Sequence, residues 1–440
     1  MLSGKRVIVV GLKKSGIAAV RLCRAEGARV LGTDKEAREK LDPELFTLGI
    51  EVVAGGHEGV DFSGADLIVV SPGVPALPEL VAAEAKGVEV IGELELACRH
   101  ITAPVVAIGG TNGKSTTTTL VGALAKAAGL RTFVGGNLGT PASDAVGGGH
   151  ELVVLEVSSF QLERAPRFRP RVSLLLNVTE DHLDRYPDFA AYARAKGNAF
   201  VNQTRDDFAI IPEGDSICED EARRGRARVL RFGESADYAV DANGVLESAT
   251  GQRFELRESR LFGLHNYENA AAAIAAARAL QIAPEAVRAG LRAFQPLPHR
   301  MALAGQVGAV RFYDDSKGTN VGASVTALLG LAEPRGVLIA GGRDKHGSYA
   351  PLVDALSLKG RALVVLGEAA ERIAVAAAGR LPIAHAKDLD EAVRLAYGFA
   401  QPGDAVLLSP ACSSFDMFAS YADRGEQFVR AVARFQEQTP

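Results

Sequence analysis

The sequence has 440 residues, of which 47% are hydrophobic and 23% charged, and its formal net charge is -4 at pH 7. This length predicts about two or three domains, and the charge excludes binding of nucleic acid or of an anionic membrane through an overall positive surface. The four cysteines form no C-x-x-C pair, which argues against a zinc site or a disulfide framework.

Neither an export signal nor a membrane-spanning segment is predicted. The first apolar run, VIVV (7–10), is too short for the core of a signal peptide. No apolar run reaches the roughly 18 residues that a membrane-spanning helix requires. Because widely spaced cysteines also suit a reducing compartment, the sequence predicts a cytoplasmic protein.

Short apolar runs rich in β-branched residues recur along the chain, and such runs are typical of strands buried on both faces. They are RVIVV (6–10), DLIVV (66–70), VVAI (105–108), LVVLEV (152–157), VSLLLNV (172–178), VLIA (337–340), ALVVLG (362–367) and AVLLS (405–409). Ala- and Leu-rich stretches at 15–27 and 269–281 predict helices. Strands that alternate with helices predict parallel sheets and an α/β fold throughout.

Two stretches indicate joints between domains, at 91–104 and at the proline-bearing QPLPHR (295–300). They divide the chain into predicted domains 1–92, 93–297 and 298–440. Because ligands of parallel α/β sheets bind at the carboxyl ends of strands, the segments that follow the apolar runs are the candidate site segments.

The first such segment is GLKKSG (11–16), where a dinucleotide-binding fold would have G-x-G-x-x-G. Lys13 replaces the second glycine, which disfavours NAD or FAD. The segment stays compatible with a uridine or other nucleoside diphosphate, whose phosphates would face Lys13, Lys14 and the N-terminus of the following helix. Asp34, after the strand ARVLGT, stands where a ribose-binding acid would, or is a plain loop aspartate.

The second segment is GGTNGKS (109–115), between a buried strand and a helix. The usual phosphate loop has its first glycine five residues before the Gly-Lys-Ser/Thr end, and Ile108 occupies that position. In a phosphate loop Lys114 would reach the β and γ oxygens and Ser115 would ligate Mg²⁺. The alternative is a glycine-rich turn with a solvated lysine, but the strand–loop–helix context favours phosphate.

Acidic and histidine side chains follow the next two apolar runs. Glu156 interrupts LVVLEV, and a carboxylate there is costly unless it is paired or binds a cation, which favours a magnesium ligand over a solvent-facing strand end. In NVTEDHLDRY (177–186), Asp181, His182 and Asp184 are capable of binding metal, although this pattern is also common on surfaces. Further on, asparagines in HNYEN (265–269) either hold a nucleotide base or cap a helix.

Taken together, these segments resemble the Mur ligases, ATP-dependent amide-forming enzymes of peptidoglycan synthesis. The matching motifs are GGTNGKST, GGNLG (135–139), LEVSSFQLE (155–163), NVTEDHLDRY, HNYENA, PHRM (298–301), DDSKGTN (314–320), GGRDK (341–345) and SPACSSFDMF (409–418). SSFQLE, DSKGTN and SPACSSFD match the members that add D-glutamate, whereas GTNGKS alone would equally suit a folylpolyglutamate synthase.

The resemblance implies an α/β fold with three domains. A Rossmann-like N-terminal domain would bind the UDP-sugar, a central P-loop ATPase-like domain would bind ATP, and a C-terminal Rossmann-like α/β domain would bind the amino acid and complete the ATP site. It implies a monomeric acid–D-amino-acid ligase that uses UDP-N-acetylmuramoyl-L-alanine, D-glutamate and ATP as small-molecule substrates, with two Mg²⁺ sites. ATP would phosphorylate the substrate carboxylate, and the amine of D-glutamate would attack the acyl phosphate.

The resemblance also assigns residues. The catalytic group comprises Lys114, Glu156, His182 and Lys196. Expected ATP contacts are Gly110, Thr111, Asn112, Gly113, Lys114, Ser115, Thr116, Asn266, Asn269, Arg300, Asp315 and Lys317. Expected UDP-sugar contacts are Ser15, Asp34, Gly73, Asn137 and His182. Expected D-glutamate contacts are Thr319, Lys345, Ser414, Phe415 and Tyr421. Expected metal ligands are Ser115, Glu156, His182 and Lys196, the last as a carbamate formed with CO₂.

The sequence departs from the family at Phe415 and Tyr421, where many relatives have Leu and Phe, and at GLKKSG, where the family has G-x-G-x-[ST]-G. Three alternative functions are a folylpolyglutamate-type ligase, an inactive ATP-binding regulator and a dinucleotide oxidoreductase. Lys13 disfavours the oxidoreductase. The regulator is disfavoured because each catalytic step has its side chain.

Overall fold

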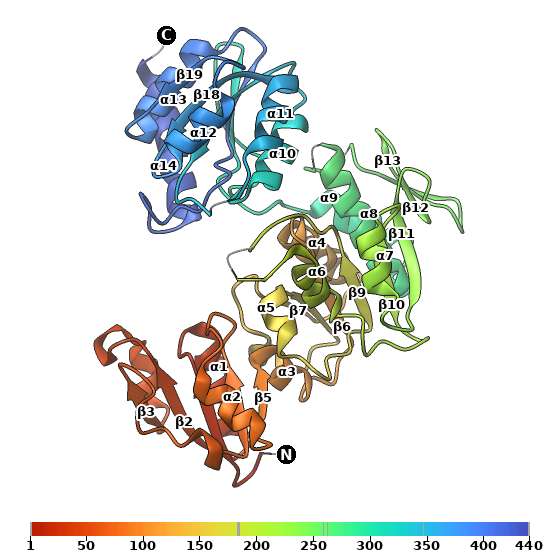
Figure 1. Ribbon diagram of the computed structural model, residues 1–440. Helices are drawn as coiled ribbons and strands as arrows, with labels where there is room; N and C mark the ends of the chain where they lie inside the picture. Colours follow the sequence, from red (N-terminus) through yellow and green to blue (C-terminus); the bar gives the residue numbers. More distant parts are fainter. Residues whose placement is uncertain (1, 183–184, 258, 262, 346, 439–440) are drawn as a thin grey trace. The chain divides into compact units, whose positions relative to one another are not determined.

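The computed structural model of the chain describes residues 2–182, 185–257, 259–261, 263–345 and 347–438. Its strands form three sheets, which Figure 1 follows along the chain. The residues pack into two compact units. Unit 1 comprises Met1–Val178, Ala190–Glu258 and Asn269–Ala293, and unit 2 comprises Thr179–Phe189, Ser259–Glu268 and Phe294–Pro440.

The first sheet, in unit 1, is parallel and has the strand order β3-β2-β1-β4-β5. Its elements are β1 (Arg6–Val10), α1 (Lys14–Ala25), β2 (Arg29–Asp34), β3 (Glu51–Ala54), β4 (Leu67–Val70), α2 (Pro78–Ala85) and β5 (Glu89–Gly92). Alternate side chains of β1 face opposite sides. Val9 packs in the cluster that contains α1, and Ile8 packs in the cluster that contains Leu80 of α2. Helices therefore cover both faces, as a buried parallel sheet requires.

The second sheet, also in unit 1, has the order β14-β13-β12-β11-β10-β9-β6-β8-β7. Its strands are β6 (Val105–Gly109), β7 (Thr132–Gly136), β8 (Leu152–Glu156), β9 (Val172–Leu175), β10 (Phe208–Pro212), β11 (Arg228–Gly233), β12 (Tyr238–Val240), β13 (Gly244–Glu247) and β14 (Gln252–Glu255). The helices of this segment are α3 (Glu93–Cys98), α4 (Lys114–Ala127), α5 (Ser159–Glu163), α6 (Phe189–Gly197), α7 (Ser216–Ala222), α8 (Leu264–Ala279) and α9 (Pro284–Ala293). Because β6 lies between β8 and β9, their carboxyl ends lie side by side.

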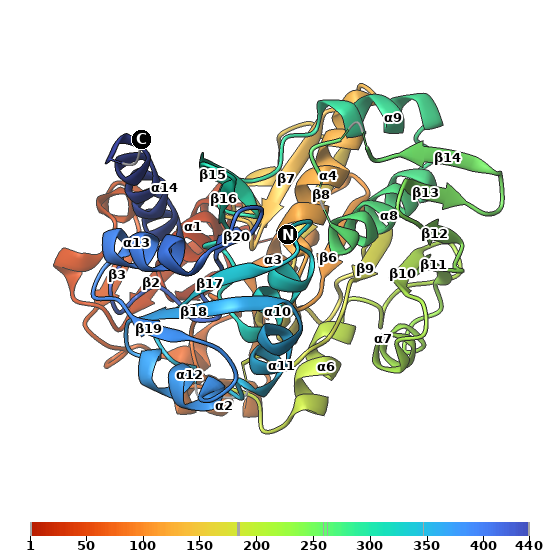
Figure 2. The same ribbon diagram turned by 90° about the horizontal axis from the view of Figure 1, so that it is seen from above.

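The third sheet, in unit 2, has the order β15-β16-β20-β17-β18-β19. Its elements are β15 (Ala302–Val307), β16 (Val310–Asp314), α10 (Val321–Leu329), β17 (Gly336–Gly341), α11 (Ala350–Lys359), β18 (Gly360–Leu366), α12 (Ala370–Ala377), β19 (Ile383–His385), α13 (Leu389–Phe399), β20 (Ala405–Leu408) and α14 (Tyr421–Gln438). Figure 2 shows α13 on one side of β17 and β18, with α11 and α12 on the other. Accordingly Leu338 packs with the α10–α12 cluster and Ile339 with the α13–α14 cluster.

All eight apolar runs are strands, with most of their residues buried, which confirms an α/β fold. Two places depart from the parallel pairing that the alternation predicts. Strands β12, β13 and β14 pair antiparallel, as do β15 and β16. Short turns explain both. Asp241 accepts backbone hydrogen bonds from Asn243 and Gly244, and Gly308 turns the β15–β16 hairpin at a φ of 56°.

The domain limits at 92/93 and 297/298 stay predictions. Among the described residues, every helix is too short or too polar to cross a lipid bilayer.

Candidate active site

The segment between β6 and α4 is a phosphate-type loop whose conformation depends on glycine. Gly110 and Gly113 have φ values of 140° and 82°, which side chains with a Cβ rarely adopt. A Cβ on Gly113 would also lie 2.3 Å from Oδ1 of Asn269. The loop is therefore closed against α8, and Asn269 lies directly beside the start of α4.

Asn177, just past β9, fixes this loop. Its backbone oxygen accepts from the Thr111 N–H at 3.0 Å. Its side-chain Oδ1 accepts from the Asn112 N–H at 2.9 Å, and its Nδ2 donates to the Asn112 carbonyl at 3.2 Å. The loop and the segment after β9 thus form one hydrogen-bonded unit.

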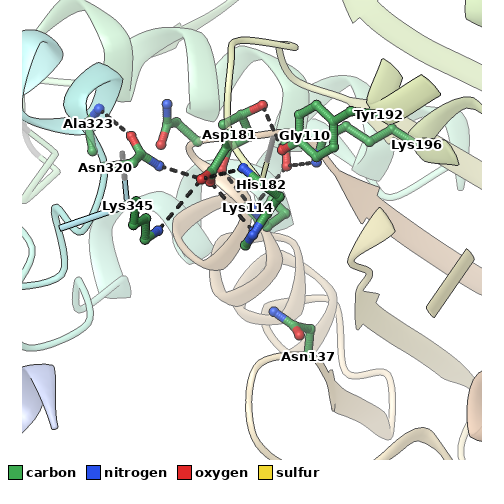
Figure 3. Close-up of polar contacts among 12 residues, drawn as sticks. Gly110, Lys114, Asn137, Asp181, His182, Tyr192, Lys196, Asn320, Ala323 and Lys345 are labelled. Atoms are coloured by element: carbon green, nitrogen blue, oxygen red, sulfur yellow. Dashed lines mark hydrogen bonds and ion pairs between the residues drawn. The ribbon is translucent and has the colours of Figure 1, made fainter. Parts of the chain in front are cut away.

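Two lysines converge on one carbonyl of the loop. Lys114 Nζ donates to the Gly110 oxygen at 2.9 Å, and Lys196 Nζ donates to the same oxygen at 2.7 Å (Figure 3). Lys196, from α6, is only 4% exposed. Its ammonium lies 4.5 Å from the ring centre of Tyr192, whose hydroxyl is 3.2 Å from Oγ1 of Thr111. A buried amine is therefore held against the phosphate loop.

Glu156 ends β8 beside this loop and is 3% exposed. Asn137 donates from Nδ2 to Glu156 Oε1 at 2.7 Å, and its backbone N–H donates to the Glu156 carbonyl at 2.9 Å. The structure thus places Asn137 beside Glu156, not at the first sheet with Ser15, Asp34 and Gly73.

Few side chains of the types that commonly bind metal ions lie around this loop. Among the described residues, no group of three or more His, Cys, Asp or Glu side chains gathers. A buried carboxylate, Glu156, and the buried hydroxyl of Ser115 nevertheless suit Mg²⁺, which commonly takes one or two protein oxygens and completes its shell with water and phosphate. These residues therefore fit that ion.

In the first sheet, Asp34 shapes the GLKKSG loop. Its Oδ2 accepts from the Leu12 N–H at 2.6 Å and its Oδ1 from the Glu36 N–H at 2.9 Å. Ser15 is half-buried at the start of α1, and Gly73 is exposed in the loop after β4. Both carboxylate oxygens of Asp34 thus hold backbone at the carboxyl edge of this sheet.

In unit 2, the segment after β16 carries Asp315. Its Oδ2 accepts from the Ser409 hydroxyl at 2.7 Å, and Ser409 follows β20, the neighbouring strand. Burial raises the pKa of Asp315 to about 7, and Arg300 opposes part of that rise. Burial also lowers the pKa of His265 to about 4, and the positive charge of Arg300 contributes to this decrease. Asn266 lies next to His265 in the first turn of α8.

Asp181, also in unit 2, contacts two expected site residues, Lys345 and His182. Its Oδ1 lies 3.6 Å from Lys345 Nζ, and its Oδ2 accepts from Asn320 Nδ2 at 3.5 Å (Figure 3). The adjacent His182 has a φ of 56° and its N–H donates to Asp181 Oδ1 at 3.0 Å. Asp184 lies outside the described residues.

The remaining expected D-glutamate contacts surround the start of α14. Tyr421 is its first residue, and its ring centre lies 3.8 Å from Lys317 Nζ. Ser414 is buried, whereas Phe415 is 66% exposed. Thr319 follows Lys317 by two residues and donates its N–H to the Lys317 carbonyl at 2.8 Å. Lys317 thus contacts Thr319 in its own segment and Tyr421 at the start of α14.

Sequence reasoning missed two residues that build these loops, Asn177 and Arg424. Arg424, 1% exposed, donates from Nε to Ser316 Oγ and from Nη2 to the Ser316 carbonyl, both at 2.9 Å. It also donates to the Cys412 carbonyl at 3.3 Å. Burial lowers its pKa to about 10. The sequence shows only an arginine in a polar helix, which does not reveal that its partners lie far along the chain.

Three family models match the chain. Residues 5–92 match the MurD-like N-terminal domain of Mur ligases, 108–277 the Mur ligase middle domain, and 299–412 the Mur ligase glutamate ligase domain. Among solved structures, the chain resembles UDP-N-acetylmuramate-alanine ligase of Thermotoga maritima, with a TM-score of 0.60 and 20% identity over 99% of this chain and 100% of the other. It also resembles a folylpolyglutamate synthase of Mycobacterium tuberculosis, with a TM-score of 0.61 and 18% identity. That match covers 76% of this chain and 92% of the other. Both show a shared fold.

Curated relatives are much more similar in sequence. A protein of Geobacter metallireducens is 45% identical over 98% of each chain. One of Anaeromyxobacter dehalogenans is 47% identical over 98% of this chain and 97% of the other. Both are named UDP-N-acetylmuramoylalanine–D-glutamate ligase. With matches to all three domain models and relatives this similar over the full length, the chain belongs to the Mur ligase family.

Proposed function

We propose that this chain joins D-glutamate to UDP-N-acetylmuramoyl-L-alanine with the conversion of ATP to ADP and phosphate. The observation that carries the proposal is the identity of 42–47% with ligases of that name over nearly the whole length of both chains. A folylpolyglutamate synthase covers only 76% of this chain, and residues 5–92 match a MurD-like N-terminal domain. Both favour a UDP-sugar substrate over a folate.

The reaction has two steps. A carboxylate oxygen of the UDP-sugar attacks the γ-phosphorus of ATP, which gives an acyl phosphate and releases ADP. The amine of D-glutamate then attacks the acyl carbon, and the amide forms as phosphate leaves and the amine loses its proton. Catalysis of such steps depends on alignment and on neutralising negative charge.

Loop residues 110–116 would hold the triphosphate, with Lys114 placed to face its β and γ oxygens. Ser115 and Glu156 would belong to one Mg²⁺ site, and His182 would serve a second Mg²⁺. Bound Mg²⁺ would neutralise phosphate charge. Asn137, which donates to Glu156 Oε1, would keep that carboxylate in a fixed orientation.

Lys196 would act as a carbamate, which replaces a buried cation with an anion capable of ligating metal. The change is compatible with its surroundings because a carbamylated Nζ keeps one N–H, enough for the bond that Nζ now donates to Gly110. In unit 2, Lys345 would pair with the side-chain carboxylate of D-glutamate as a point charge. Asp181, 3.6 Å from Lys345 Nζ, keeps that lysine oriented.

We further propose that the enzyme acts as a monomer in the cytoplasm. Its substrates are small molecules. Its anion-binding loops would bind them locally, because an overall charge of -4 does not attract anions.

Phosphate release with ATP, Mg²⁺ and UDP-N-acetylmuramoyl-L-alanine tests the function directly. We expect release with D-glutamate to exceed release with L-glutamate, D-aspartate or L-lysine by at least about a hundredfold, since a mismatched amino acid leaves a charged partner unpaired. Lys345→Ala should raise the KM for D-glutamate much more than that for ATP. Release no higher with D-glutamate than without an amino acid would refute the proposal.

A further inference from the structure

Tyr421 lies at a junction between residues of two different proposed sites. By resemblance its ring lines the amino-acid pocket, and Lys317 contacts ATP. In the structure the Lys317 ammonium lies over the Tyr421 ring, 3.8 Å from the ring centre. A cation at this distance over an aromatic face is attracted by the ring quadrupole.

The backbone holds this pair in register. The Ser316 hydroxyl donates to the Tyr421 carbonyl at 2.8 Å, so the residue before Lys317 is tied to the residue that carries the ring. The Lys317 N–H donates to the His299 carbonyl at 3.1 Å, and the His299 ring meets the Tyr421 ring edge-on at 6.5 Å. The His299 ring is itself fixed, since its Nδ1 lies 2.6 Å from Asp314 Oδ2. The Tyr421 ring and the backbone that carries Lys317 are therefore both held in place.

We propose that Tyr421 is a positioning residue for ATP, which holds the Lys317 ammonium through its ring face in addition to lining the amino-acid pocket. The inference rests on the proposed function for the two pockets. Lysine has a long, flexible side chain, so a ring that restricts it lowers the entropy lost when the ammonium meets phosphate. One aromatic ring then serves both substrates.

Replacing the ring separates this role from that of a pocket wall. Tyr421→Leu keeps apolar bulk but removes the ring. If Tyr421 positions Lys317, the KM for ATP rises about five- to tenfold together with that for D-glutamate. A pocket wall alone would raise only the KM for D-glutamate, and that result would overturn the proposal.

A fluorinated series tests the cation–π contact itself. Phenylalanine and its mono-, di- and trifluoro derivatives, incorporated at position 421, keep the ring shape while fluorine weakens its negative face. We expect the Kd of a non-hydrolysable ATP analogue, measured by calorimetry on the full chain, to rise stepwise with each fluorine. A Kd that is constant across the series would also overturn the proposal.

Phe435→Leu is the matched control. Phe435 lies on the same helix, α14, and its ring packs against Tyr397 at 5.1 Å, away from both proposed pockets. Loss of this ring should leave the Kd of the analogue unchanged. If wild-type protein binds the analogue but releases no phosphate with D-glutamate, the proposed substrates are wrong, while the fluorine series still tests the ring.

Discussion

At Gly113 the backbone and a neighbouring side chain both exclude a Cβ. The φ of 82° favours glycine, and Asn269 Oδ1 occupies the space that a methyl group would need. The loop therefore turns into α4 without a glycine at position 108. The chain reverses at Gly110 and Gly113 within four residues and enters α4 directly, so that Lys114 is already helical.

Gly113→Ala should therefore abolish nucleotide binding and lower stability. We expect a loss of about 2 kcal/mol or more, because the left-handed conformation costs about 1 kcal/mol and the clash must displace Asn269. Calorimetric titration with ADP and urea denaturation measure the two effects.

Gly129→Ala is the control for the conformational cost. Gly129 follows α4 at a φ of 83°, but a Cβ there would meet nothing within 4 Å. It should lose about 1 kcal/mol and bind ADP normally. Equal loss of ADP binding in both variants would contradict the steric explanation.

At the scale of the element, α4 tolerates four successive threonines because tertiary packing compensates for their poor helix propensity. Thr117 and Thr118 are fully buried. Thr117 donates to Asn269 Oδ1 at 3.4 Å, and Thr119 donates to the Ser115 carbonyl at 2.8 Å. The threonines therefore help to attach α4 to α8 and to close its own first turns.

Thr118 is different, since its buried Oγ1 has no hydrogen-bond partner among the described residues. Thr118→Val keeps the shape and removes an unsatisfied polar atom, so we expect a gain of about 1 kcal/mol in the free energy of unfolding. Thr119→Val, which removes a hydroxyl that is bonded, should instead lose about 0.5 kcal/mol. Urea denaturation of both variants decides this, and a loss in Thr118→Val would show that its hydroxyl is satisfied.

The strands show which elements a sequence can predict. Central strands such as β6 and β8 are buried on both faces, so their apolar runs are continuous and easily recognised. Strand β11 is half-buried and includes Arg228 and Arg231, so it lacks that pattern. Motifs single out Lys114 and Glu156 as candidate site residues, and their roles stay predictions. Asn177 and Arg424 act through partners distant in sequence, and no local pattern encodes that distance.

For the whole molecule, each compact unit contains a buried carboxyl group whose pKa is raised. In unit 1, Glu93 is 1% exposed and accepts from the Ser143 N–H at 2.6 Å. Burial raises its pKa from 4.5 to about 6. In unit 2, burial raises the pKa of Asp315 from 3.8 to about 7. Both groups bind a proton more tightly in the folded chain than in the unfolded chain.

The sign of the pH dependence follows from linkage. The stabilising contribution of each group is complete below its unfolded pKa, near 4, and is lost as the pH rises through the folded value. For Glu93 the loss is on the order of 2 kcal/mol, at about 1.4 kcal/mol for each pH unit between the two pKa values. The chain should therefore lose stability between about pH 4 and pH 7.

Calorimetric unfolding across that pH range, with Glu93→Gln and Asp315→Asn, tests whether the two units respond separately. Each amide is neutral at every pH, so each variant should flatten the pH dependence of one transition and leave the other sloped as in the wild type. Because the two carboxyl groups lie in different units, their effects should also add in the double variant. If both variants flatten the same transition, the units unfold as one cooperative body, and the separate response is refuted.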